Sequence, residues 1–95
     1  MADPSAYEWA ELARATRRDL LEDLAAGRET LSGALDRAQE DPLIGRIYVL
    51  VVLEALPGAG KVATRRALDR LGIEHRTPLA DVPADVVLAN FGGES

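Results

Sequence analysis

Apolar residues recur every three or four positions along most of the chain, which is the spacing of amphipathic helices. Residues 1–28 contain the longest such stretch. Ser5 to Glu8 has the sequence of a capping box, and Gly27 follows the last apolar position. One inward face of a long first helix is predicted from six residues: Trp9, Leu12, Ala13, Thr16, Leu20 and Leu24.

A second helix is predicted after Thr30, which can cap its N-terminus. Its inward positions fall at i, i+3, i+4 and i+7: Leu31, Ala34, Leu35 and Ala38. Asp41 and Pro42 should end this helix, because they supply a cap and a first residue for a third one.

The third element has features of both a strand and a helix. Strand propensity is high at Ile47, Val49, Val51 and Val52. The helical interval is nevertheless kept by Ile44, Ile47, Val51 and Ala55. Because the segment is also longer than a typical buried strand, we expect a helix that is buried on most sides.

Two more helices complete the predicted fold. The fourth, about 61–71, ends at Gly72 and has four inward residues: Thr64, Ala67, Leu68 and Leu71. The fifth runs roughly from Pro83 to Phe91, after a turn that contains Thr77 and Pro78. We therefore predict an all-α protein of about five helices, with residues 1–95 as one domain, 1–28 as its N-terminal helix and 29–92 as its helical core.

Composition limits the class of protein. The 95 residues are 47% hydrophobic but only 4% aromatic, and there is no cysteine to form a disulfide or to bind a metal. The longest apolar run, from Ile47 to Leu53, is far shorter than the roughly 20 residues of a membrane span. Since the N-terminus is acidic, unlike a signal sequence, we expect a cytoplasmic protein with no membrane partner.

The charge is unevenly distributed. A net charge of −5 argues against a nucleic-acid partner, because acidic surface repels phosphate. The net charges of residues 1–42, 43–76 and 77–95 are, however, −5, +3 and −3. The middle of the chain therefore concentrates the positive charge.

Within this middle block, Leu56 to Lys61 forms a Pro-Gly-x-Gly turn between two predicted helices. Gly58 and Gly60 allow a positive φ and leave room for a ligand, and the next helix begins with unpaired N–H groups. Four cations lie outward on that helix: Lys61, Arg65, Arg66 and Arg70. The arrangement resembles a helix-hairpin-helix, a non-specific binder of nucleic-acid backbone.

The same turn has two other interpretations. A Walker-type loop would need a glycine where Ala55 stands and a hydroxyl where Val62 stands, so nucleotide hydrolysis is not expected. A plain turn between packed helices remains an alternative.

His75 has no second histidine or cysteine to form a metal site with, and we expect it in an exposed loop. No nucleophile is paired with a base, so we expect no enzyme, metal or cofactor.

Three segments resemble the actinobacterial integration host factor family, whose members are all-helical nucleoid-associated proteins with a helix-two-turn-helix core. They are Leu43–Arg46, Leu53–Val62 and Arg70–Ile73. Weaker similarity extends to Arg14–Arg18 and Phe91–Gly93. The resemblance implies binding and bending of double-stranded DNA with little sequence specificity, and a place in the nucleoid.

By matching position, the resemblance implies that the amides near Gly58 and Gly60 and the side chains after them hold one DNA strand. The implied contacts of the hairpin are Gly58, Gly60, Lys61, Arg65 and Arg66, with Arg46 beside them. Arg17 and Arg18, next to Arg14, would make a second contact along the first helix.

The chain also departs from the family pattern. Family members are usually basic, whereas this first helix is rich in Asp and Glu, and Thr77–Asp81 lacks the arginines of the family's turn before the last helix. We therefore expect a divergent acidic member that binds DNA weakly. The alternative is a protein-interaction module of the same fold, whose acidic surface docks on a protein partner or imitates DNA.

Overall fold

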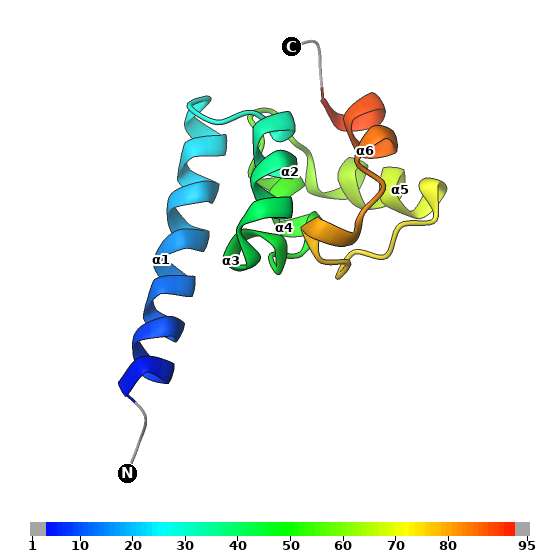
Figure 1. Ribbon diagram of the computed structural model, residues 1–95. Coiled ribbons are helices and arrows are strands. Elements are labelled where there is room, and N and C mark those ends of the chain that lie inside the picture. The colour runs from blue at the N-terminus through cyan, green and yellow to red at the C-terminus, as the bar shows by residue number, and fades with distance from the viewer. Residues whose placement is uncertain (1–3, 93–95) are drawn as a thin grey trace.

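Helices form most of residues 4–92, the part of the chain that the computed structural model describes (Figure 1). The elements are α1 (Pro4–Ala26), α2 (Leu31–Glu40), α3 (Pro42–Gly45), α4 (Val49–Glu54), α5 (Lys61–Leu71), a 3-10 turn η1 (Leu79–Asp81) and α6 (Ala84–Phe91). The described residues form no β-strand, which confirms the all-α prediction. They contain one α-helix more than the five expected.

Local signals place most helix ends correctly. The Thr30 side chain accepts a hydrogen bond from the Gly33 amide at 3.0 Å, and Asp41 accepts one from the Leu43 amide at 2.9 Å. Gly72 caps α5 in the left-handed conformation, with φ of 72°. One cap is wrong: α1 begins at Pro4, so Ser5 lies within the helix and not at its N-cap.

The predicted third helix is two helices, α3 and α4, separated at residues 46–48. Tyr48 is extended and forms an antiparallel bridge with Pro78. The Leu79 amide donates to the Ile47 carbonyl at 2.8 Å, and the Val49 amide donates to the Thr77 carbonyl at 2.8 Å. These contacts with a distant segment replace the helical hydrogen bonds that local periodicity predicted.

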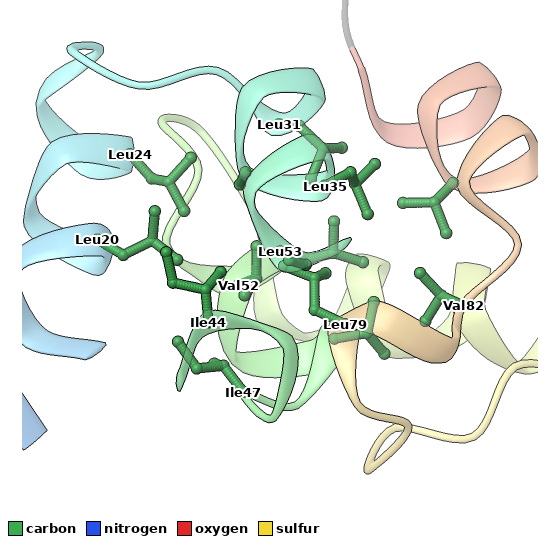
Figure 2. Close-up of a cluster of buried hydrophobic side chains, with 14 of the residues drawn as sticks. Leu20, Leu24, Leu31, Leu35, Ile44, Ile47, Val52, Leu53, Leu79 and Val82 are labelled. Atoms are coloured by element: carbon green, nitrogen blue, oxygen red, sulfur yellow. The ribbon is translucent and has the colours of Figure 1, made fainter. Parts of the chain in front are cut away.

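The core lies between the C-terminal half of α1 and the remaining helices (Figure 2). Leu20 and Leu24 point from α1 toward Ile44 of α3, and all three are fully buried. α3 also packs against α2 and η1. The four predicted inward residues of α2 are all buried, as are Val49, Val52 and Leu53 of α4. Val51 and Ala55, which we expected inside, are only partly buried.

The N-terminal half of α1 extends beyond the other helices (Figure 1). Trp9 is 43% exposed and Leu12 is 55% exposed, whereas Leu20 and Leu24 are buried. The expected inward face therefore exists only in the second half of the helix, because the core does not reach the first half. No helix within residues 4–92 is both long enough and apolar enough to cross a membrane.

Candidate nucleic-acid interface

The hairpin between α4 and α5 is a closed turn, with a positive φ at one of its two glycines. The Ala59 amide donates to the Leu56 carbonyl at 3.1 Å and closes the turn. Gly58 has φ of 78°, a conformation that L side chains rarely adopt, although a Cβ there would meet no atom within 4 Å. Gly58 is therefore required by the backbone conformation of the turn and not by packing.

Gly60 has a different role from Gly58. Its φ is −94°, so the predicted positive φ is wrong at this position, and it is the N-cap of α5. No side chain caps this helix. The first N–H groups of α5 are therefore left for an external acceptor, at the positive end of the helix dipole. An anion is the acceptor that such a helix end favours.

The cations after the hairpin lie on the surface, as predicted. Lys61, Arg65, Arg66 and Arg70 are all exposed. Arg65 is partly neutralised, because its Nε lies 3.5 Å from Oε2 of Glu54 on α4. That carboxylate oxygen is buried and accepts no hydrogen bond. Within residues 4–92, Lys61 and Arg66 have no ion pair.

Arg46 lies against α1. Its guanidinium carbon is 4.8 Å from the centroid of the Trp9 ring, a cation–π distance. The two residues line an open groove of about 480 Å³ between α1 and the α3–α4 segment. Its lining residues are Trp9, Ala10, Ala13, Arg14, Arg17, Leu43, Arg46, Ile47, Tyr48 and Val51. The expected position of Arg46 beside the hairpin stays a prediction, while its side chain shares this groove with Arg14 and Arg17.

The arginines of the first helix differ in their surroundings. Arg14 binds Glu11 at 2.7 Å, and Arg18 lies 3.7 Å from Asp19. Arg17 faces the groove and has no ion pair among the described residues. Sequence reasoning identified these arginines but missed the two exposed aromatic rings beside them, those of Trp9 and Tyr48. The sequence offered one indication of them: the chain has only four aromatic residues, and two of the four line this groove.

His75 is less exposed than expected. It is half-buried, and its Nε2 lies 3.0 Å from Oδ1 of Asp69. The histidine therefore ties the loop after α5 back to that helix. Residues 4–92 contain no group of three or more potential metal ligands.

The comparisons with known proteins agree on one family. Residues 24–77 match the family model described as an S13-like H2TH domain. The chain is 36% identical over 69 residues to the integration host factor of Streptomyces coelicolor, covering 73% of this chain and 64% of that protein. It is 33% identical over 91 residues to the integration host factor of Mycobacterium tuberculosis, covering 93% of this chain and 87% of that protein.

A solved structure of sIHF bound to an 8-bp palindromic DNA has the same fold. It superposes with a TM-score of 0.83 and 30% sequence identity, covering 90% of this chain and 99% of that one. These matches confirm the resemblance that the motifs around the hairpin indicated. The chain belongs to the integration host factor family of actinobacteria, and residues 24–77 are its S13-like H2TH domain.

Proposed function

We propose that this protein binds the phosphate backbone of double-stranded DNA and bends it, as a nucleoid-associated protein of the cytoplasm. The observation that carries the proposal is the uncapped N-terminus of α5 at an exposed hairpin, beside Lys61 and Arg66, which form no ion pair with any described residue. The similarity to an sIHF structure bound to DNA supports the same role. The role is one of binding and not of catalysis.

The contacts would be made mainly to phosphates. The amides at Gly58 and Gly60 and the side chains of Lys61, Arg65 and Arg66 would hold one strand. Because phosphate contacts carry no base information, we expect little sequence specificity. Arg46 would lie beside these contacts. Arg17 and Arg18 would make a second contact along α1, and two separate contacts on one duplex are what bending requires.

Binding should be weak and sensitive to salt. The chain has a net charge of −5, and the hairpin offers few cations. If about three or four phosphates are neutralised, the logarithm of the affinity should fall with the logarithm of the salt concentration at a slope near −3.

Fluorescence anisotropy with two labelled duplexes of unrelated sequence tests the proposal. We expect similar affinities for both at every salt concentration, and energy transfer between dyes at the duplex ends should rise when the protein bends the DNA. An absence of binding even at low ionic strength would overturn the proposal. The protein-interaction alternative would then be preferred, with a pull-down from lysate as its first test.

A further inference from the structure

We propose that the groove between the N-terminal half of α1 and the α3–α4 segment binds a nucleoside phosphate. The base would lie on the exposed rings of Trp9 and Tyr48, and the arginines of the groove would hold the phosphate. This site is separate from the hairpin. It shares Arg17 and Arg46 with the proposed contacts to duplex DNA, but its ligand is an unpaired nucleotide.

The charge of the groove favours an anion. The chain has 16 acidic and 11 basic residues, yet the groove is lined by Arg14, Arg17 and Arg46 and by no acidic residue. Arg17 and Arg46 have no ion pair among residues 4–92, and only Arg14 is engaged, by Glu11. Three arginines therefore line one groove of a protein that is acidic overall. A ligand with a phosphate would satisfy them.

The aromatic rings favour a planar group next to that phosphate. Trp9 is 43% exposed and Tyr48 is 46% exposed, so each aromatic side chain keeps a large surface that a ligand can reach. They are two of the four aromatic residues in the chain, and they come from segments about forty positions apart in sequence. Exposed rings beside cations are the combination with which proteins stack unpaired bases.

Arg46 links the two halves of the site. Its guanidinium lies 4.8 Å from the Trp9 ring centroid, so the stack fixes the orientation of the cation. A stacked guanidinium keeps its N–H edges free to donate to phosphate oxygens. The base would then stack on the Tyr48 ring and on the part of the Trp9 ring that Arg46 does not cover.

The size of the groove fits one unpaired nucleotide. Its volume of about 480 Å³ is within the range of small-molecule sites. The bases of an intact duplex are stacked on each other and cannot reach the two rings. The nucleotide would therefore be either a free mononucleotide or an unpaired nucleotide of a strand.

Trp9 is the single tryptophan of the chain, so its fluorescence reports directly on this site. We would titrate the full chain with deoxyadenosine monophosphate, with an eight-residue oligodeoxythymidylate and with deoxyribose 5-phosphate, which has no base. Both base-containing probes should quench Trp9 if free nucleotides bind. Quenching by the oligonucleotide alone would identify a strand as the source. Equal quenching by the probe without a base would overturn the stacking site.

Alanine variants test whether the ligand binds through the residues of the groove. Tyr48→Ala should weaken binding of the oligonucleotide about tenfold, the usual effect of removing one stacking ring. Arg17→Ala should reduce its salt slope by about 0.7, the value for one phosphate contact in single strands. Arg37→Ala on α2, which removes the same charge outside the groove, should change neither. Circular dichroism would verify that each variant is folded.

Two results would overturn the proposal. One is a Trp9 signal that none of the three probes changes. The other is an equal loss of affinity in the Arg37 and Arg17 variants, which would indicate a general charge effect. Either result would leave the binding of duplex DNA at the hairpin untouched, because that binding is measured separately by anisotropy.

Discussion

The guanidinium carbon of Arg46 lies 4.8 Å from the ring centroid of Trp9, and this contact ties the end of α3 to the projecting half of α1. We expect a coupling energy of about 0.5–1 kcal/mol, because the pair is partly exposed. A double-mutant cycle of Trp9→Ala and Arg46→Ala in urea unfolding measures it. Strictly additive effects would show that the contact contributes nothing to stability.

The hairpin cations should dominate the affinity for duplex DNA. Replacing Lys61 and Arg65 together by Ala should nearly abolish binding and flatten the salt slope by about two, since two phosphate contacts are lost. Arg28→Ala with Arg37→Ala is the matched control, because it removes the same charge from two residues that are ion-paired away from the hairpin. Unchanged affinity in the Lys61 and Arg65 variant would make the hairpin a structural turn only.

Gly60→Ser should separate stability from binding. A serine at the N-cap of α5 can accept a hydrogen bond from the open amides, which stabilises the helix by a few tenths of a kcal/mol. The same hydroxyl would compete with a DNA phosphate, so we expect about three- to tenfold weaker binding in anisotropy titrations.

Gly60→Ala is the control for that experiment. Its Cβ would meet only the Ala63 Cβ at 3.8 Å, an ordinary contact, and it adds no acceptor. It should lose less affinity than the serine variant. Equal losses would mean that the bulk of the side chain matters and that the free amides do not.

Glu54 should restrain the interaction of Arg65 with DNA. Its carboxylate lies 3.5 Å from the Arg65 guanidinium and also repels an approaching phosphate. Glu54→Gln should therefore tighten binding by about two- to fivefold, the range of a partly exposed ion pair. The effect should disappear when Arg65 is already Ala. A glutamine variant that binds DNA more weakly would contradict this role.

The two neighbouring valines of α4 should differ in their effect on stability. Val52 is fully buried, so Val52→Asp buries an unpaired charge and should cost about 4 kcal/mol or more, enough to unfold a small domain. Val51 is partly buried and lines the groove, so Val51→Asp should cost clearly less. Val62→Asp, at a position 63% exposed, should change little. Urea unfolding measures all three, and equal costs at positions 51 and 52 would refute the observed orientation of α4.

Several helix ends are determined locally and could be predicted from the sequence. Thr30 and Asp41 cap through bonds to amides two or three residues away, and Gly72 adopts the left-handed conformation that ends α5. The outward position of the α5 cations follows from helical periodicity in the same way. The family motifs are also contiguous, so the sequence alone sufficed to recognise them.

Other features depend on segments that are distant in the sequence. α3 and α4 are separate because Ile47 and Val49 bond to residues 77–79, an interaction that no local pattern encodes. The outer half of α1 is exposed because the core ends before it, although its apolar spacing continues. The groove joins Trp9 to Arg46 and Tyr48 by the packing of α1 on α3. Periodicity tells which face of a helix is apolar, but only tertiary packing decides whether anything covers that face.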